Sequence, residues 1–444
     1  MTIQALSTKE ISYRVLDELS VRLKVEENPY FLALDNVFSM AARNNPKRSY
    51  LFVSKLIGKH IPVRPAVPFV AGFLLASRLA EVLGLAVDQR KINEAVTILS
   101  DDFDHDFRSK PYSFPGRALF IGFAETATAL GHAVFNSYAG AVQYLHTTRE
   151  NLLGAHDTLF FTEDHCHAPD QRCLIPDSSL MQGHDLVVLI DDEITSGNTG
   201  LNIIKAIQQK YPQKKYVILT ILDWRSPAAQ AKYKSAAEEL GVEIKVVSLL
   251  KGRFWAEGMA PVIKEPLITE ASGGSAPRYL EEKMGLEIKA PLVGGPATNY
   301  LGYTGRFGLN AWHNSRLLTE AREIGQCLAS QRKGKRTLCL GTGEFMYIPF
   351  LIAKYMGEGI QVQSTTRSPV HPCQREDYAV KQAIRFRDPF IPEVKNYVYN
   401  IPPNRYDEVF VFWEKKVLAE QVAPFVQAME QLAINNIVFV SFCH

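Results

Sequence analysis

The chain has 444 residues, of which 46% are hydrophobic and 22% are charged, and its formal net charge at pH 7 is +2. This composition is typical of a globular protein with two or three domains, and the small net charge argues against a broad nucleic-acid-binding surface. The sequence has no apolar stretch long enough to span a bilayer and no apolar signal region at its start, so we expect a cytoplasmic protein without a membrane partner.

The first hundred residues contain two predicted helices and a basic cluster. Apolar spacing predicts a modest amphipathic helix at residues 11–23 and a stronger one at residues 71–85. The acidic run at residues 100–106 lacks the glycine and the distal glutamate of a calcium loop, so we expect an exposed loop there. A basic cluster suits an anionic substrate, although the spacing fits a solvated face equally well. The basic cluster consists of Arg43, Lys47, Arg48, Lys55, Lys59 and His60.

Residues 117–131 predict a strand, a loop of small residues and the start of a helix. Their sequence is Arg-Ala-Leu-Phe-Ile-Gly-Phe-Ala-Glu-Thr-Ala-Thr-Ala-Leu-Gly. Gly122, at the end of the predicted strand, permits a close backbone approach or an unusual dihedral angle. Every α/β protein has such turns, so this pattern gains its weight from the motif that follows it in the chain.

A long polar segment at residues 150–183 follows a predicted strand that ends in Thr147-Thr148-Arg149. We expect this segment to be irregular, and loops of that length inside a compact domain are usually functional or disordered. Its histidines and cysteines do not have the spacing of a zinc site, and the six cysteines of the chain form no Cys-x-x-Cys pair, so we expect reduced thiols. Contact with a substrate on loop closure and a plain surface loop are the two alternatives.

The most informative stretch is residues 185–200, Asp-Leu-Val-Val-Leu-Ile-Asp-Asp-Glu-Ile-Thr-Ser-Gly-Asn-Thr-Gly. It predicts a buried parallel strand closed by Asp191 and Asp192, a loop of small residues, and a helix at residues 201–210. The amides and hydroxyls of such a loop suit a phosphate group. Two adjacent carboxylates suit the vicinal hydroxyls of a sugar that carries this phosphate, and they can orient Mg²⁺ through water. A simple capped turn would explain the loop but not the aspartates.

This motif resembles the site for 5-phosphoribosyl-1-pyrophosphate (PRPP) in the type I phosphoribosyltransferases. The family pattern is a hydrophobic strand, two acidic residues, two variable residues, two Thr/Ser, Gly, any residue and Thr, and every fixed position matches here. It is not a Walker loop, because no Gly-Lys-Ser/Thr is present. The residues that the resemblance places at PRPP are Asp191, Asp192, Glu193, Thr195, Ser196, Gly197, Asn198 and Thr199.

The resemblance implies an α/β fold with a mainly parallel sheet flanked by helices, and a second α/β domain behind it. It also implies transfer of phosphoribosyl from PRPP to a nitrogen acceptor, release of pyrophosphate, Mg²⁺ as cofactor and a homodimer. Asp191 and Asp192 would be the catalytic pair, holding the ribose hydroxyls and orienting Mg²⁺ indirectly. The rival interpretation is a regulator that binds PRPP or a nucleotide without chemistry.

The resemblance assigns roles to two further segments. In the loop after the strand at residues 117–122, Glu125 is unusual, because a carboxylate beside pyrophosphate would need Mg²⁺ between them. The pyrophosphate loop would comprise Gly122, Phe123, Ala124, Glu125, Thr126 and Ala127. The mobile loop that closes over the substrate would contribute Arg149, Glu163, His165 and His167. Closure would protect an oxocarbenium-like transition state from water.

Two more strands are predicted at residues 215–223 and 242–250. Because strand ends in a parallel sheet face the ligand crevice, Trp224 would stack on a planar acceptor, with core packing as an equal alternative. Gly, Ser and Pro then become frequent. The predicted division of the chain is a phosphoribosyltransferase domain with an N-terminal extension at 1–265, a linker at 266–300 and a second domain at 301–444.

The C-terminal part predicts a second α/β unit that contains Thr366-Arg367-Ser368-Pro369. These four residues spell the signature of the TRSP domain, which follows a distinctive PRTase_2-type phosphoribosyltransferase in bacterial gene clusters for tellurite resistance and stress. The resemblance covers roughly residues 40–260 and 290–444. It implies a step in the synthesis of a nucleoside-like metabolite, with functional partners among neighbouring stress-cluster enzymes.

Two loops of this second unit should meet at the ends of adjacent strands. Gly341 and Gly343 would expose amides there, and Arg367 would supply a fork for a phosphate or carboxylate, so we predict a small anion-binding crevice that also includes Glu344. A structural salt bridge between Arg367 and Glu344 is the alternative. The Gly122-to-Arg149 spacing of 27 residues (149 − 122) resembles the Gly341-to-Arg367 spacing of 26 (367 − 341), which suggests an ancient duplication.

Overall fold

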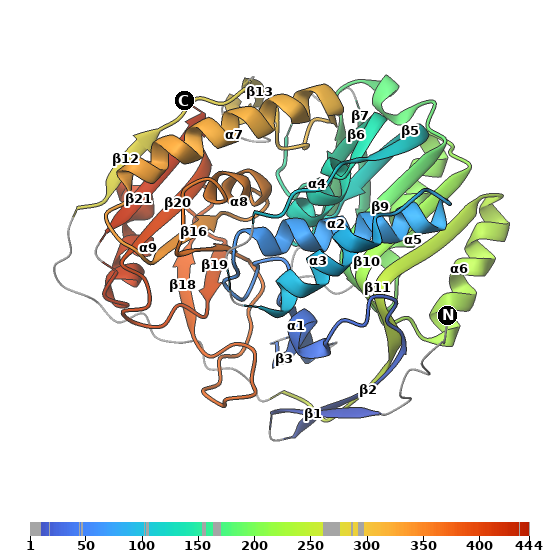
Figure 1. The fold of residues 1–444 in the computed structure, drawn as a ribbon, viewed down its shortest axis with the longest axis horizontal. Helices are drawn as coiled ribbons and strands as arrows, with labels where there is room; N and C mark the ends of the chain where they lie inside the picture. Colours follow the sequence, from blue (N-terminus) through green and yellow to red (C-terminus); the bar gives the residue numbers. More distant parts are fainter. Residues whose placement is uncertain are drawn as a thin grey trace.

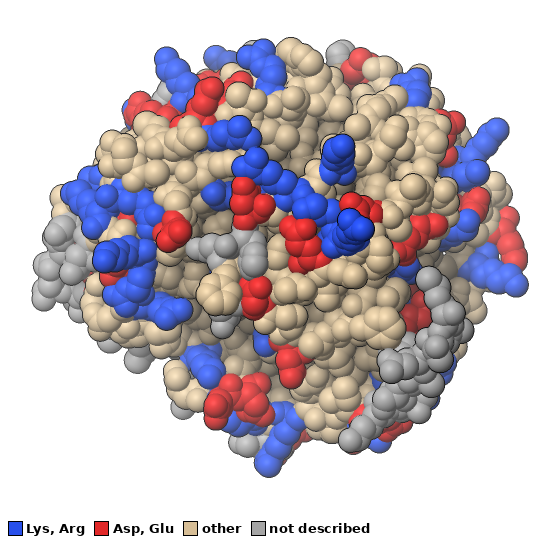
Figure 2. All heavy atoms as spheres, viewed as in Figure 1, with Lys and Arg blue, Asp and Glu red and all other residues tan. Residues whose placement is uncertain are grey.

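The computed structural model describes residues 10–16, 18–43, 45, 48–101, 103, 106–152, 157–162, 170–260, 276–285, 287–291, 297–434 and 436–443. Two sheets flanked by helices organise these residues, so the α/β class is confirmed (Figure 1). No helix in the described ranges is long and apolar enough to cross a membrane. On the face shown in Figure 2, acidic and basic side chains are interspersed rather than gathered by sign.

The larger sheet has eight strands in the order β1-β2-β11-β10-β9-β5-β6-β15. Strands β11, β10, β9, β5 and β6 run parallel, and β2 and β15 pair antiparallel at the two sides. In chain order its strands are β1 (Ile11–Leu16), β2 (Leu19–Glu27), β5 (Tyr112–Gly122), β6 (Tyr138–His146), β9 (Leu186–Ile194), β10 (Lys215–Asp223), β11 (Glu243–Glu257) and β15 (Leu309–Asn310).

The helices of this sheet lie on both of its faces. Helix α4 (Thr128–Asn136) carries the chain from β5 to β6, while α5 (Asn198–Lys210) and α6 (Pro227–Leu240) carry it in the opposite direction, from β9 to β10 and on to β11. Right-handed crossovers therefore place α4 and α5 on opposite faces. The other helices of this half are α1 (Leu34–Val37), α2 (Ala66–Val82), α3 (Gln89–Ser100) and the 3₁₀ turn η1 (Ser178–Met181).

The smaller sheet has five strands in the order β12-β21-β20-β16-β17. Its order β21-β20-β16-β17 repeats the order β10-β9-β5-β6 of the larger sheet, with all neighbours parallel, which agrees with the duplication hypothesis. Its elements are β12 (Arg278–Glu281), α7 (Ala311–Gln331), β16 (Thr337–Gly341), α8 (Tyr347–Ala353), β17 (Ile360–Ser364), β20 (Glu408–Lys415), α9 (Ala419–Glu430) and β21 (Ile437–Cys443).

Four two-stranded ribbons complete the described fold. They are β3 (Phe38–Ala42) with β4 (Tyr50–Ser54), β7 (Asp157–Thr162) with β8 (Asp170–Ile175), β13 (Glu287–Pro291) with β14 (Ala297–Leu301), and β18 (Ala383–Arg387) with β19 (Lys395–Tyr399). Part of the segment predicted as a linker, residues 266–300, thus forms β12, β13 and most of β14, and β12 is an edge strand of the smaller sheet.

Two predictions about local structure are wrong. Residues 11–23 form the hairpin β1–β2 rather than a helix, because buried Leu19, Val21 and Leu23 alternate with polar residues at the period of a strand. Residues 150–183 are not irregular throughout, because β7 and β8 pair antiparallel and bury alternate side chains such as Leu159 and Phe161.

The two sheets share one continuous hydrophobic core. Backbone hydrogen bonds join the two halves where Val63, in the segment before α2, and Val362 of β17 exchange both N–H···O contacts, at 3.0 and 2.7 Å. The ring of His132 on α4 stacks on Tyr347 of α8 with centroids 3.6 Å apart, and its Nε2 lies 2.8 Å from Asn314 Oδ1 on α7. These contacts make the two halves one packed body.

Acid should destabilise this body. Burial lowers the pKa of His60, His132 and His146 from 6.5 to about 3. The unfolded chain therefore binds more protons than the folded chain between pH 6.5 and 3, and stability is lost as the pH falls through this window. Each histidine contributes a slope of about 1.4 kcal/mol per pH unit. Urea unfolding at pH 7.5 and 5.5 should show a lower free energy at pH 5.5, and His132→Gln should show a smaller difference. Equal stability at both pH values would contradict this.

Candidate active site

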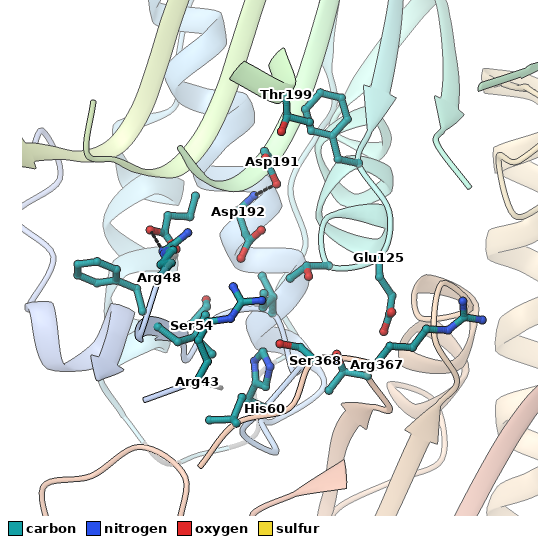
Figure 3. A pocket seen from close by; sticks show the side chains of 18 of the residues that line it. Arg43, Arg48, Ser54, His60, Glu125, Asp191, Asp192, Thr199, Arg367 and Ser368 are labelled. Atoms are coloured by element: carbon teal, nitrogen blue, oxygen red, sulfur yellow. Dashed lines mark hydrogen bonds and ion pairs between the residues drawn. The ribbon is translucent and has the colours of Figure 1, made fainter. Parts of the chain in front are cut away.

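A cavity of about 640 Å³ lies at the carboxyl ends of β5 and β9 (Figure 3). This is where the crossovers diverge, and ligands of open α/β sheets bind outside the strand ends at such a point. Most of its lining comes from the β3–β4 ribbon with the segment after it, from the end of β9 and the loops that follow β5 and β9, and from residues 366–397 of the C-terminal part. Arg149, Ile218 and Tyr233 also line it.

The paired aspartates lie on the cavity wall. Asp191 and Asp192 are inside β9 rather than beyond its end, because the strand continues to Ile194. Both are half-buried, and the Asp192 amide donates to Asp191 Oδ1 at 2.9 Å. The carboxylate of Asp192 points into the open space in Figure 3. Two oxygen-rich groups thus face a space large enough for a sugar phosphate.

Glu193 is part of the wall and already has a charged partner. Its Oε1 lies 2.5 Å from Arg48 Nη2, and both side chains are largely buried. Burial raises the pKa of Glu193, although Arg48 acts in the opposite direction. The guanidinium of Arg48 also lies 5.0 Å from the ring centre of Tyr50. Arg48 and Glu193 therefore hold the β3–β4 ribbon against β9.

The loop after β9 has the geometry of a phosphate cradle. Thr195, Ser196, Gly197 and Thr199 line the cavity in front of the N-terminus of α5. Gly197 has φ +72°, and a Cβ there would come within 2.5 Å of the ring of Tyr233. Only glycine fits this position without strain.

A buried ion pair supports that loop from behind. Tyr233 Oη donates to the Gly197 carbonyl at 2.7 Å. The Arg225 guanidinium lies 4.6 Å from the Tyr233 ring centre and is fixed by two 2.8 Å bonds to the Asp223 carboxylate. Asn198 points elsewhere, since its side chain contacts Lys232 and it does not line the cavity. The cradle is thus built from residues 195–197 and 199.

The loop after β5 approaches the same cavity. At Gly122 a Cβ would lie 2.7 Å from Tyr144 Oη and 2.9 Å from the Ala127 carbonyl, so a side chain is excluded. The Ala124 amide donates to Thr147 Oγ1 at 2.7 Å, and the peptide bond between Ala124 and Glu125 is cis. Of the six residues predicted for this loop, Phe123, Glu125 and Thr126 line the cavity.

Glu125 is neutralised by cations of the protein. It is 5% exposed, and its Oε1 lies 2.5 Å from Nζ of Lys59, which is 1% exposed. Its Oε2 lies 3.4 Å from Arg149 Nη1. Burial opposes ionisation, but Lys59, Arg149 and Arg367 outweigh it and hold the pKa of Glu125 below its ordinary value. Mg²⁺ is therefore not needed to neutralise this carboxylate.

The C-terminal loops meet as predicted. The Gly343 amide donates to Thr365 Oγ1 at 3.0 Å, and the Thr365 amide donates to the Gly341 carbonyl at 3.0 Å. A second cavity of about 120 Å³ lies beside them. The alternative salt bridge is wrong, because the acid that faces Arg367 is Asp388 at 4.0 Å, while Glu344 lies 3.6 Å from Arg306.

Comparison with known families agrees with this geometry. Residues 37–253 match the phosphoribosyl transferase family PRTase_2, and residues 303–429 match the TRSP domain that stands C-terminal to it. The chain thus combines a PRTase_2 region with a TRSP region. Its two matched regions are called the PRTase_2 and TRSP domains below. None of the curated proteins matches the sequence.

The chain is also similar to solved adenine phosphoribosyltransferases. The enzyme from Trypanosoma brucei, in complex with AMP, pyrophosphate and ribose 5-phosphate, is 11% identical with a TM-score of 0.31, over 51% of this chain and 82% of that one. The Giardia lamblia enzyme is 18% identical with a TM-score of 0.23, over 31% and 70%. The Saccharomyces cerevisiae enzyme is 11% identical with a TM-score of 0.22, over 31% and 68%.

The remaining predicted residues have mixed outcomes. Arg149 lines the cavity, whereas Glu163, His165 and His167 lie outside the described residues. Trp224 is 2% exposed and stacks on Phe52 at 5.2 Å between ring centres, so its ring serves the core rather than an acceptor. Because β10 lies one strand away from the point where the crossovers diverge, its end faces a separate, shallower cavity.

Sequence reasoning missed several residues that line the cavity. Phe52, Ser54, Tyr397 and Val394 line it, and no local pattern points to them. His60 stands out in the sequence only as a member of the basic cluster. It is 7% exposed, and its Nε2 has no hydrogen-bond partner among the described residues. Burial, together with Lys59 and Arg43, lowers its pKa to about 3, so the imidazole is neutral and can exchange hydrogen bonds with a ligand.

The other members of the basic cluster divide between the cavity and the surface. Arg43 and Arg48 line the cavity, and Lys59 is buried against Glu125. Lys55 Nζ donates to the Asp35 carbonyl at 2.6 Å, and Lys47 lies outside the described residues. In the described part of the chain, no group of three or more His, Cys, Asp or Glu is placed to hold a metal ion.

The glycine of the phosphate cradle gives a direct test. Gly197→Ala should weaken PRPP binding at least tenfold, because the new methyl group meets Tyr233 and the left-handed conformation costs about 1–2 kcal/mol. Gly241→Ala is the matched control, since Gly241 has φ +65° but a Cβ added there would meet no atom within 4 Å. Calorimetry should show weaker PRPP binding in the first variant only. Equal affinities in the two variants would argue against the cradle.

Proposed function

We propose that this protein transfers the phosphoribosyl group of PRPP to a nitrogen of a base-like acceptor and releases pyrophosphate. The observation that carries the proposal is the convergence of three elements on one cavity. A phosphate cradle at residues 195–197 and 199, the carboxylates Asp191 and Asp192, and the loop with Glu125 all line it. A sugar with a phosphate at one end and pyrophosphate at the other needs these three kinds of group in this order.

Each element has a separate task in the transfer. The cradle binds the 5′-phosphate through amides and hydroxyls. The aspartates accept hydrogen bonds from the ribose hydroxyls and stabilise the positive charge that develops as the C1–O bond to pyrophosphate breaks. The acceptor nitrogen then bonds to C1, and its proton is released. Positioning and electrostatics, rather than one strong base, lower the barrier.

Mg²⁺ is the cofactor expected for this reaction. The residues present fit an ion held with the substrate, because Asp191 and Asp192 offer hard oxygen atoms, while the described residues form no complete protein cage. When bound with PRPP, the ion would neutralise part of the pyrophosphate charge. The two carboxylates would orient its water ligands, as well as the ribose.

The acceptor has space along the wall formed by the β3–β4 ribbon, the segment after it and residues 366–397. There Phe52, Val370 and Val394 supply apolar surface, and His60 and Ser368 add polar groups. Apolar walls with few polar groups suit a planar heterocycle, whose edge hydrogen-bonds while its faces pack.

The β7–β8 ribbon is the described part of the segment expected to close over the substrate. Its Phe161 packs against Phe123 of the loop after β5, with ring centres 6.2 Å apart. Phe123 also lines the cavity. This contact with a cavity-lining residue supports the proposal that the ribbon covers the substrate.

The aspartate pair provides the test. Asp191→Asn combined with Asp192→Asn should reduce PRPP-dependent pyrophosphate release by more than a hundredfold, because the amides cannot stabilise positive charge at the sugar. Pyrophosphate release should be measured against a panel of bases and nucleoside analogues. Asp185→Asn is the matched control at the other end of the same strand segment, where Asp185 accepts from the Arg117 amide at 2.9 Å.

The control variant should lose some stability but retain activity. A double mutant with wild-type kcat/KM for PRPP would overturn the proposed function. If the wild-type protein binds PRPP tightly but releases no pyrophosphate with any acceptor, the sensor interpretation replaces the enzyme.

A further inference from the structure

We propose that Arg367 of the TRSP domain and Arg149 of the PRTase_2 domain together bind the pyrophosphate group, so that the TRSP domain supplies part of the reaction site. This inference rests on the proposed function. It assigns a ligand to the C-terminal crevice predicted from the sequence, and it names the chemical class of that ligand as a diphosphate anion.

The position of the two arginines is the first argument. Glu125, Arg149 and Arg367 line both the 640 Å³ cavity and the 120 Å³ cavity, so they form the partition between the two spaces. In Figure 3 the side chain of Arg367 extends past Glu125, away from Asp192. In the proposed function, Glu125 belongs to the loop that faces the leaving group of PRPP. A cation here is therefore on the pyrophosphate side of the sugar and not on the acceptor side.

The way in which the two arginines reach this partition is the second argument. The Thr147 amide donates to the Gly122 carbonyl at 2.9 Å, and the Thr365 amide donates to the Gly341 carbonyl at 3.0 Å. Each threonine follows the strand next to its glycine, and an arginine stands two residues later. The same local geometry thus delivers one arginine from each sheet to a common wall.

The length of the Arg367 ion pair is the third argument. Lys59 is held tightly by Glu125 at 2.5 Å, whereas Arg367 lies 4.0 Å from Asp388. The longer distance exceeds the usual range for an N–H···O bond. Because Lys59 already neutralises Glu125, Arg367 can turn to a stronger anion. A diphosphate offers several oxygens that match the guanidinium fork.

The other cations around the small cavity do not compete for this role. Arg306 makes two 2.9 Å bonds to the Glu414 carboxylate, and Lys415 lies 3.5 Å from Glu150. These cations are directed at acids of the small cavity and do not line the larger one.

An acid of the same cavity fixes the backbone that carries Arg149. The Glu344 carboxylate accepts from the Arg149 amide at 2.5 Å and from Thr148 Oγ1 at 2.7 Å. Glu344 belongs to the TRSP domain, so this domain positions Arg149 as well as supplying Arg367. Both arginines at the partition therefore depend on the second domain for their place beside the reaction cavity.

The consequence for the reaction is electrostatic. As the C1–O bond breaks, the electron pair goes to the departing pyrophosphate oxygen. Two guanidinium groups beside that oxygen stabilise the added negative charge more in the transition state than in the bound substrate. Arg367 is then a catalytic residue contributed by the second domain.

The experiment compares two probes of the same site. Titration calorimetry should measure the binding of Mg²⁺-pyrophosphate and of ribose 5-phosphate to the full-length protein. Arg367→Ala should weaken pyrophosphate binding at least tenfold and leave ribose 5-phosphate binding unchanged, because the latter lacks the leaving group. Arg149→Ala should behave in the same way. Arg336→Ala is the matched control, since Arg336 is exposed and pairs with Asp407 at 2.5 Å in the same domain.

A purely structural role for Arg367 predicts a different pattern. Asp388→Asn removes the negative charge that faces Arg367. It keeps a side-chain oxygen, and in the wild type Asp388 Oδ1 accepts hydrogen bonds from the Phe390 and Ile391 amides at 2.9 and 3.1 Å. If Arg367 binds pyrophosphate, this variant should bind it as well as the wild type or more tightly. If the ion pair is what matters, both variants should melt earlier and neither should change pyrophosphate affinity, and the inference is then wrong.

Failure of this inference is separable from failure of the proposed function. Wild-type protein that binds ribose 5-phosphate through the aspartate pair, but whose pyrophosphate affinity does not depend on Arg367, overturns the inference alone. The same holds if wild-type protein binds ribose 5-phosphate and no pyrophosphate. Wild-type protein that binds neither PRPP nor ribose 5-phosphate overturns both.

Discussion

One buried ammonium group, that of Lys59, connects loops from both domains beside the 640 Å³ cavity. Lys59 lies in the chain between the β3–β4 ribbon and α2, and it is 1% exposed. Its Nζ forms an ion pair with Glu125 of the PRTase_2 domain and also donates to the Gly343 carbonyl of the TRSP domain at 3.1 Å. A buried charge is tolerated only when it is paired and hydrogen-bonded, so removal of either partner leaves the other costly to bury. Three segments distant in sequence are thereby kept in a single arrangement around the cavity.

The surrounding structure follows from that arrangement. Loops at strand ends are mobile unless packing fixes them, and here both loops of the PRTase_2 domain are supported from behind. Tyr233 and the Asp223–Arg225 pair support Gly197, while Tyr144 and Thr147 support the loop that starts at Gly122. The TRSP domain adds a further wall through residues 366–370. These contacts hold the loops of the candidate site in place before any ligand binds.

Sequence reasoning succeeded where the signal is local. The strand, paired aspartates and small-residue loop at residues 185–200 lie within one strand–loop–helix unit, and the meeting of Gly343 with Thr365 follows from adjacent strand ends. Sequence reasoning failed where the contact that decides the structure is made with a residue far away in the sequence. No sequence pattern near Trp224 predicts its contact with Phe52, and none near Lys59 predicts its contacts with Glu125 and Gly343. Residues 11–23 are a separate case, because their buried apolar residues alternate at the period of a strand, and this local signal competes with the helical spacing.

The repeated strand order gives this chain the architecture of a pseudo-dimer within one polypeptide. In a true homodimer every substitution appears in both subunits, so a residue that suits one half of a shared site must be tolerated in the other. Here β9 carries Asp191 and Asp192, while the register of the corresponding strand β20 places Trp413 and Glu414 at these positions, and Glu414 is paired with the buried Arg306. Because the two halves are encoded separately, one can keep the paired aspartates while the other is free to shape the cavity.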